Sequence, residues 1–257
     1  MCVIHKAPGQ AIIAIDAFAL PCVVAHIMGQ ALAKAIEEAG HSHAGGIDQG
    51  DDLTALASAS DVLVDFSSPA ALQDTLDICI AANKPIVIGT TGLQDDHHAA
   101  IDVAAAKIPI LQTGNTSLGV NMLAALVEQA TSKLGDDWDI EIVEMHHRHK
   151  VDAPSGTAKL LGEAAAKGRN TDLSSNSESG RDGITGARTK GAIGFAALRG
   201  GSVAGDHTVI LASDEERIEL THRAENRMIF ARGAVKAADW LAGQSVGRFG
   251  MEGVLGL

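Results

Sequence analysis

Apolar and polar positions in the first half of the chain follow two periods, one helical and one extended. Residues 30–40 place apolar side chains at helical spacing and end at Gly40, which predicts a helix. The other predicted elements are strands at 44–47, 61–66, 85–88 and 108–112 and helices at 53–59, 69–82 and 95–107. Strands that alternate with helices predict an α/β class with a doubly wound, Rossmann-like parallel sheet.

The pattern changes after Val120, where strands follow one another more closely. The predicted elements are helices at 121–134, 157–167 and 230–241 and strands at 139–146, 192–199, 207–213 and 217–224. Successive strands without intervening helices predict an α+β second domain with a mixed or largely antiparallel sheet. Residues 170–190 are rich in Gly, Ser, Asn and Asp, which predicts a mobile loop.

Small polar residues follow three strands of the predicted parallel sheet, at 66–68, 89–91 and 113–116. Ligands of open α/β sheets bind outside the carboxyl ends of the strands. Each loop taken singly is as readily a plain turn. Their repetition at successive strand ends favours a cofactor site.

Composition removes several classes of function. The net charge of −12 disfavours a nucleic-acid surface, because phosphate binding needs clustered Lys and Arg. Three cysteines without framework spacing favour a reduced, cytoplasmic protein. The most apolar window, residues 11–28, is broken by Asp16, Pro21 and His26, so neither a membrane span nor a membrane partner is expected.

Candidate chemistry gathers after the strand at 139–146. His146, His147 and His149 precede Lys150, and the turn that opens the next helix begins at Ser155. Histidine exchanges protons near neutral pH, and free N–H groups at a helix start bind carboxylates. A single histidine at a strand end is more often structural, but three with a lysine favour a functional site. A metal centre is disfavoured, because no cysteine or carboxylate lies nearby at ligand spacing.

These residues carry a resemblance to a known family. The segment 144–158 reads E-x-H-H-x-x-K-x-D-A-P-S-G-T-A and resembles the signature of the 4-hydroxy-tetrahydrodipicolinate reductase (dihydrodipicolinate reductase) family. The similarity continues in the segments 64–67, 88–92, 115–121, 191–196, 199–201, 205–208 and 219–224, so it covers the chain from Met28 onward. It implies reduction of 4-hydroxy-tetrahydrodipicolinate to tetrahydrodipicolinate with NAD(P)H, in diaminopimelate and lysine biosynthesis.

The resemblance also implies roles for single residues and domains. His146 is implied as general acid, assisted by Lys150, while His147, Gly156 and Thr157 contact the dicarboxylate substrate; His149 receives no role. The cofactor residues implied or expected are Met28, Gly29, Asp48, Gly89, Thr90, Thr91, Gly114, Asn115, Thr116 and Ser117. Residues 1–117 with 228–257 are expected to bind the dinucleotide, and 118–227 to bind substrate and form a homotetramer.

Asp48 lies about 20 residues beyond Gly29, the spacing at which an acidic group bonds the ribose 2′-hydroxyl of NAD. A lone Asp after a strand is as often a turn residue. Gln49 beside it offers no charge to a 2′-phosphate, so the sequence favours NADH over NADPH.

The first 27 residues depart from the family pattern. The family opens with a strand leading into G-x-x-G-x-M-G, whereas residues 23–29 keep only Met28 and Gly29, and Pro21 stands where the strand is expected. An altered reading frame is the preferred explanation. A cofactor-impaired variant, or a strand at 11–15 followed by a long loop, are the others. We therefore expect weak dinucleotide binding.

Two other functions fit parts of the pattern. A catalytically inactive relative that binds a metabolite or pairs with other subunits would explain the altered N-terminus. Another two-domain dehydrogenase of the aspartate pathway, such as homoserine dehydrogenase, would explain the sheet but not the paired histidines.

Overall fold

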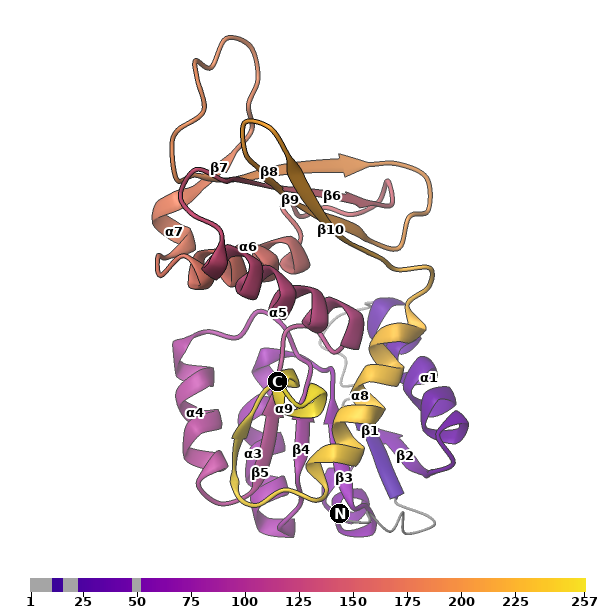
Figure 1. Cartoon of the computed structure of the whole chain (residues 1–257). Coiled ribbons are helices and arrows are strands. Elements are labelled where there is room, and N and C mark those ends of the chain that lie inside the picture. The colour runs from indigo at the N-terminus through magenta and orange to yellow at the C-terminus, as the bar shows by residue number, and fades with distance from the viewer. Residues whose placement is uncertain (1–10, 16–22, 48–51) are drawn as a thin grey trace. The chain divides into compact units, whose positions relative to one another are not determined.

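The structure, a computed structural model, describes residues 11–15, 23–47 and 52–257. The chain divides into two compact units, Met1–Leu118 with Met228–Leu257 and Gly119–Arg227. The first unit is built around a parallel sheet and the second around a mixed sheet (Figure 1). The predicted fold class is thereby confirmed.

Parallel strands form the centre of the first unit, in the order β11-β5-β4-β3-β1-β2. Its elements are β1 Ala11–Ile15, α1 Val23–Glu38, β2 Ser42–Ile47, α2 Leu53–Ala59, β3 Val62–Asp65, the 3₁₀ turn Pro69–Ala71, α3 Leu72–Ala82, β4 Ile86–Ile88, α4 Asp95–Ala105, β5 Pro109–Gln112, α8 Met228–Leu241, β11 Gly247–Phe249 and α9 Met251–Leu255.

Both faces of this sheet are buried, because successive side chains of a strand point to opposite sides. Val62, Val64 and Val87 face α1 and α8. Leu63 and Ile86 face α3 and α4, where they meet the side chains of Leu72, Leu76, Cys79 and Ile101. Helices therefore cover both faces of the sheet.

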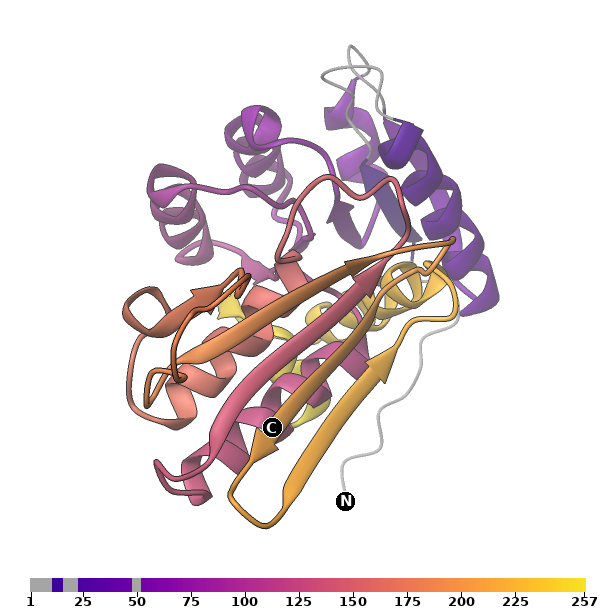
Figure 2. The same ribbon diagram turned by 90° about the horizontal axis from the view of Figure 1, so that it is seen from above.

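The second unit holds a sheet in the order β10-β9-β6-β8-β7. Its elements are α5 Leu118–Lys133, which starts at the junction, β6 Asp139–His146, α6 Gly156–Gly168, α7 Leu173–Asn176, β7 Ser177–Ser179, β8 Ile193–Arg199, β9 Asp206–Ala212 and β10 Arg217–Arg223. Leu123 and Val127 of α5 and Leu161 of α6 pack on one face of the sheet. Figure 2 looks onto its opposite face.

The N-terminal region differs from the sequence prediction. The helix expected from residue 30 begins at Val23, since no Gly or Pro interrupts residues 23–28. Met28 and Gly29 therefore lie in its second turn. β1 pairs in parallel with both β2 and β3 and supplies the first strand, so the expectation of that strand near Pro21 was wrong. The strand required by the third explanation is present; Pro21 itself lies outside the described residues.

The second sheet is mixed, which is the first of the two forms that the sequence predicted. β6 pairs antiparallel with β9 but parallel with β8. The reason is α6, because a helical crossover returns the chain so that the next strand runs in the same direction.

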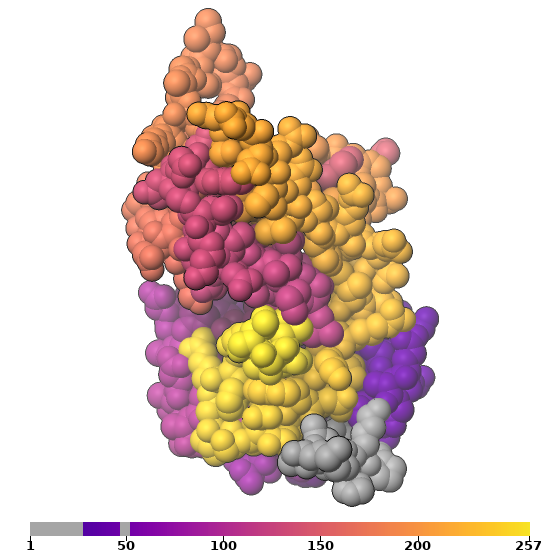
Figure 3. Space-filling view, in the orientation of Figure 1, coloured from indigo at the N-terminus to yellow at the C-terminus, as the bar shows by residue number. Residues whose placement is uncertain are grey.

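The segment 170–190, predicted as a loop, contains α7 and the edge strand β7, which pairs parallel with β8. β7 is short and polar, as edge strands often are, so its residues carry no apolar signal. Arg181 and Arg188 both bond Glu141 of β6 and hold the rest of the segment to the sheet. The segment between β7 and β8, which contains the exposed Ile184, forms the projection at the top of Figure 3.

Candidate active site

Glu144 and His146 lie side by side at the end of β6. Alternation along the strand places both side chains on its buried face. His146 Nδ1 donates to Glu144 Oε2 at 2.6 Å. The register of the sheet adds two neighbours on the same face, since Arg199 of β8 pairs with His146 and His207 of β9 pairs with Glu144. Sheet pairing therefore assembles a cluster from three strands.

Glu144 receives hydrogen bonds on both oxygens although its side chain is completely buried. Arg199 forms a bidentate contact, Nη1 to Oε2 at 2.7 Å and Nη2 to Oε1 at 2.9 Å. The backbone N–H of Ser155 donates to Oε1 at 3.2 Å. Burial alone would raise the pKa of Glu144, but the hydrogen bonds from Arg199 and His146 outweigh it and hold that pKa below its usual range. The carboxyl is therefore ionised.

His207 closes the other side of the cluster. Its ring meets that of His146 edge to face, with centroids 5.1 Å apart. Its Nε2 and Ser155 Oγ share a hydrogen bond of 2.9 Å, and the same Oγ caps α6 by accepting from Ala158 N at 3.1 Å. Burial, reinforced by the charge of His146, lowers the pKa of His207 to about 4. His207 is therefore neutral at physiological pH.

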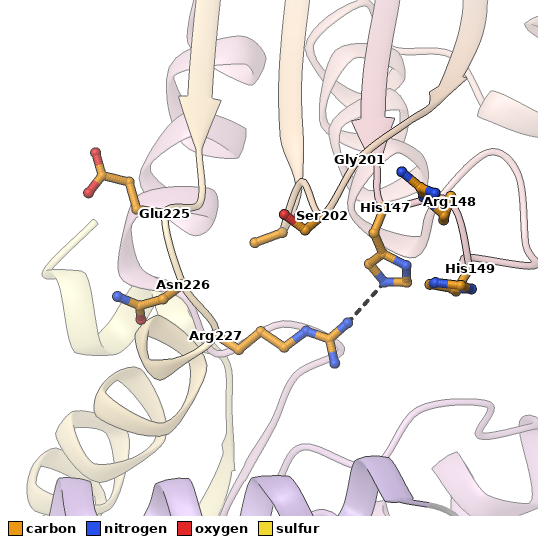
Figure 4. Close-up of a pocket in the computed structure, with 9 residues that line it drawn as sticks. His147, Arg148, His149, Gly201, Ser202, Glu225, Asn226 and Arg227 are labelled. Atoms are coloured by element: carbon orange, nitrogen blue, oxygen red, sulfur yellow. Dashed lines mark hydrogen bonds between the residues drawn. The ribbon is translucent and has the colours of Figure 1, made fainter.

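A hollow of about 840 Å³ opens beside this cluster, within the second unit. It is lined by the turns after β6 and β8 and by the segment that leads into α8 (Figure 4). Arg227 Nη2 donates to His147 Nε2 at 3.0 Å across it. Burial and the nearby charge of Arg227 lower the pKa of His147. Arg148 and Arg227 line the hollow with a single acidic residue, Glu225, which favours an anionic ligand.

The structure brings only some of the predicted residues to this hollow. His147 lines it, and so does His149, to which the sequence gave no role. His146 does not line it and is only 8% exposed. Lys150 Nζ pairs with Asp152 Oδ1 at 2.8 Å. Gly156 and Thr157 open α6 beside the cap residue of that helix, on the same side as Glu144.

Sequence reasoning missed the partners of His146. Arg199 and His207 stand 53 and 61 positions further along the chain, so only the strand register could have joined them to β6. Glu144 carried a signal, because an acidic residue two positions before a histidine in a strand shares its face. The link from Arg227 to His147 spans 80 positions and has no local signal.

Most of the expected cofactor residues of the first unit follow β4 and β5, whereas Met28 and Gly29 lie within α1. Gly89 and Thr90 follow β4, and the turn after β5 is held by Thr113 Oγ1, which accepts from Asn115 N at 3.1 Å. Asn115 Oδ1 accepts from Ser117 N at 2.9 Å, and Thr116 Oγ1 donates to the carbonyl oxygen of Phe230 in α8 at 2.7 Å. Gly114 and Thr91 belong to the same two loops, while Asp48 lies outside the described residues.

These loops offer hydrogen-bonding groups suited to a dinucleotide. Asp65 Oδ2, Ser67 Oγ and Thr90 Oγ1 are buried without a hydrogen-bond partner among the described residues. A Cβ added at Gly114 would meet no described atom within 4 Å, so a ligand can approach the backbone there. Burial raises the pKa of Asp65. Unused polar atoms beside an open backbone fit the ribose and amide groups of a nicotinamide cofactor.

The described residues contain no group of three or more His, Cys, Asp or Glu arranged to hold a metal ion. None of their helices is both long and apolar enough to cross a membrane.

The two sheets together indicate a class of protein. A doubly wound parallel sheet with polar strand-end loops is typical of dinucleotide-binding domains. Joined to a second sheet that carries histidines at its strand ends, it defines a two-domain, nucleotide-dependent oxidoreductase.

Comparison with known proteins gives the family. The domain described as "Dihydrodipicolinate reductase, N-terminus" matches residues 9–116, and its C-terminal counterpart matches residues 119–255. The 4-hydroxy-tetrahydrodipicolinate reductase of Zymomonas mobilis subsp. mobilis is 58% identical over 237 residues, which cover 90% of this chain and 93% of the relative. That of Methylocella silvestris is 59% identical over 207 residues, covering 80% and 76%. The chain belongs to the dihydrodipicolinate reductase family.

The similarity begins at residue 9, upstream of Met28, where the motifs alone had placed its start. Among solved structures, a dipicolinate-bound dihydrodipicolinate reductase from Paenisporosarcina sp. TG-14 matches with a TM-score of 0.75 at 19% identity, covering 95% of this chain and 98% of that one. At this identity the likeness supports the fold.

Proposed function

We propose that this chain reduces 4-hydroxy-tetrahydrodipicolinate to tetrahydrodipicolinate, with NADH or NADPH, in diaminopimelate and lysine biosynthesis. Relatives at 58% and 59% identity bear the name of that reductase, and both domains of the family are present. The single observation that carries the chemistry is His146, a buried histidine bonded to an ionised carboxylate.

His146 is the proposed proton donor. Loss of the 4-hydroxyl group as water leaves a conjugated C=C–C=N system in the substrate ring. A bound nicotinamide would supply a hydride to this system, and a proton would have to neutralise the negative charge that the addition leaves. Because Nδ1 of His146 donates to Glu144, the proton for the substrate has to leave from Nε2. Ionised Glu144 stabilises the imidazolium that holds this proton.

The substrate carboxylates are the proposed ligands of the cationic groups and of the α6 N-terminus. Gly156 and Thr157 lie at that N-terminus, where backbone N–H groups and the helix dipole attract an anion. His147 and Arg227 face each other across the hollow and can bind a second carboxylate. Lys150, which pairs with the exposed carboxylate of Asp152, can exchange that partner for the substrate.

For the cofactor, the proposed contacts are the loops after β4 and β5, which contain Gly89, Thr90, Thr91, Gly114, Asn115, Thr116 and Ser117. Met28 and Gly29 remain proposed contacts on the resemblance alone, and Asp48 on its spacing from Gly29. NADH is the proposed preference, because Gln49 offers no positive charge to a 2′-phosphate.

We propose that the active form is a cytoplasmic homotetramer assembled through the second unit. The resemblance supports this. Leu198 of β8 is 51% exposed and lies on the sheet face opposite to the core residue Phe195, where a partner subunit could cover it.

The test is the oxidation of NADH and NADPH by the purified chain with freshly generated substrate. We expect turnover that His146→Ala lowers by roughly 10²–10⁴-fold, the usual contribution of a general acid, and that His98→Ala on exposed α4 leaves unchanged. An NADH titration distinguishes the inactive relative, which would bind cofactor weakly or show no turnover. Full activity of the His146→Ala protein would refute the proposed proton donor.

A further inference from the structure

We propose that Glu144 is a positioning residue for catalysis, which fixes the tautomer and direction of the His146 ring and ties that ring to the α6 N-terminus. This inference rests on the proposed function, because it concerns the histidine assigned there as the acid. Glu144 itself makes no proposed contact with substrate or cofactor.

The hydrogen bonds of Glu144 determine which nitrogen of His146 carries a fixed hydrogen. Its two oxygens accept from His146 Nδ1, from both terminal nitrogens of Arg199 and from Ser155 N. An ionised carboxylate can only accept hydrogen bonds, so Nδ1 must carry a hydrogen in every protonation state of the ring. Nε2 is consequently the nitrogen that gains and loses the exchangeable proton.

The direction of Nε2 follows from the same contact. With Nδ1 held at 2.6 Å from Glu144, the opposite edge of the ring points toward the backbone of Gly205, where a Cβ would lie 3.0 Å from Nε2. Glycine at this position keeps that nitrogen uncovered by a side chain. The carboxylate and the glycine therefore orient and uncover the proton donor from two sides.

Stability alone does not account for this arrangement. A carboxylate with no exposed surface loses its hydration, and a buried ion pair often stabilises a fold no better than apolar residues of the same volume. The strand positions around it are largely apolar, with Ile140 and Ile142 on the same face of β6. The position of a charged Glu144 at the end of these apolar positions is better explained by the chemistry of the adjacent His146 ring.

Glu144 also connects the acid to the proposed carboxylate site. Ser155, whose N–H it accepts, is the N-cap of α6, and the next two residues are Gly156 and Thr157. A shift of the carboxylate would therefore displace the proton donor and the helix start together. The charged and titratable groups around the ring of His146 are Glu144, Arg199, His207, His147 and Lys150.

The first measurement needs no variant at Glu144. In the full-length protein labelled with ¹⁵N-histidine, and with His146→Ala used to assign the signal, neutral His146 should show the Nδ1–H tautomer. Observation of the Nε2–H tautomer would overturn the proposal. This readout does not depend on turnover, so it remains valid even if the proposed reaction is wrong.

The second measurement replaces the charge while it keeps the shape. In Glu144→Gln the amide oxygen should stay at the Oε1 position, which faces two donors, Arg199 Nη2 and Ser155 N. The NH₂ group then faces His146 Nδ1, so we expect the ring to change to the Nε2–H tautomer. We expect kcat to fall by about 100-fold or more with a smaller change in KM. The alkaline limb of the kcat–pH profile should move to lower pH, because the imidazolium has lost its counter-charge.

Arg199→Gln is the matched control, because it breaks the ion pair but leaves the contact between Glu144 and His146. We expect this variant to keep the Nδ1–H tautomer. If it impairs kcat as strongly as Glu144→Gln, with neither protein showing a change of tautomer, the role of Glu144 is only structural and the proposal fails. If wild-type protein has no turnover but shows the expected tautomers, the proposed function fails instead.

Discussion

Replacing Gly233 by alanine tests how α8 supports the proposed cofactor loop. Gly233 lies inside α8, where a Cβ would overlap the carbonyl oxygen of Thr116 and approach its carbonyl carbon to 2.8 Å. The obstacle is backbone, so it cannot rotate away as the end of a flexible side chain could. The helix would have to move relative to the turn after β5.

Two opposing effects set the magnitude. Alanine is favoured over glycine inside a helix by about 0.5–1 kcal/mol, which stabilises the variant. Insertion of a methyl group into a packed contact costs about 1–3 kcal/mol, and the rigid carbonyl favours the upper part of that range. We therefore expect Gly233→Ala to destabilise the first unit by about 1–2 kcal/mol and to weaken NADH binding through Thr116.

The assay is urea unfolding followed by tryptophan fluorescence. The chain has two tryptophans, so in a Trp138→Phe background the signal comes from Trp240 of α8 alone. Gly243→Ala is the matched control, because its Cβ would approach no described atom closer than 3.8 Å and should leave the midpoint unchanged. An unchanged or higher urea midpoint for Gly233→Ala would contradict the reasoning.

Three further outcomes are expected. His207 stabilises the fold above pH 6.5, and this contribution is lost as the pH falls toward 4, because only the unfolded chain binds the proton in that interval. The loss amounts to about 2 kcal/mol at pH 5. The difference in urea midpoint between pH 7 and pH 5 should therefore be smaller in His207→Gln than in the wild-type protein. Equal differences in the two proteins would refute this role of His207. Arg227→Met should raise the substrate KM roughly 10- to 150-fold with little change in kcat, because a hydrogen bond to a charged group is lost. An unchanged KM would show that the hollow does not bind the substrate carboxylate. Gly205→Ala, which places a Cβ 3.0 Å from His146 Nε2 at a φ of +154°, should lower kcat roughly 100-fold; full activity with an intact circular dichroism spectrum would exclude that role for the glycine.

Local signals were sufficient for much of the fold. The strand at 139–146 and the helix at 53–59 match β6 and α2, because each has clear periodicity and ends at an evident boundary. β7 and β11 were not predicted. Each has three residues, too few to show a period of two, and pairing with β8 and β5 is what makes them strands.

The site was predictable only where its parts are close in sequence. The segment from His146 to Thr157 stands out because histidines, a lysine and a helix start occur together. The partners of its first histidine come from β8 and β9, and their arrival depends on a register that no single segment encodes. His149 shows the opposite error, since proximity in sequence did not reveal that its side chain lines the hollow.

The late position of α8 in the chain has a consequence for synthesis. Ala231, Ala234 and Leu241 fill one face of a sheet whose strands β1 to β5 emerge from the ribosome more than a hundred residues earlier. The continuous segment 119–227 can therefore fold while the earlier half still exposes an apolar layer. At about 5–20 residues per second that exposure lasts several seconds or longer, which makes the nascent chain a candidate for chaperone binding until its last thirty residues appear.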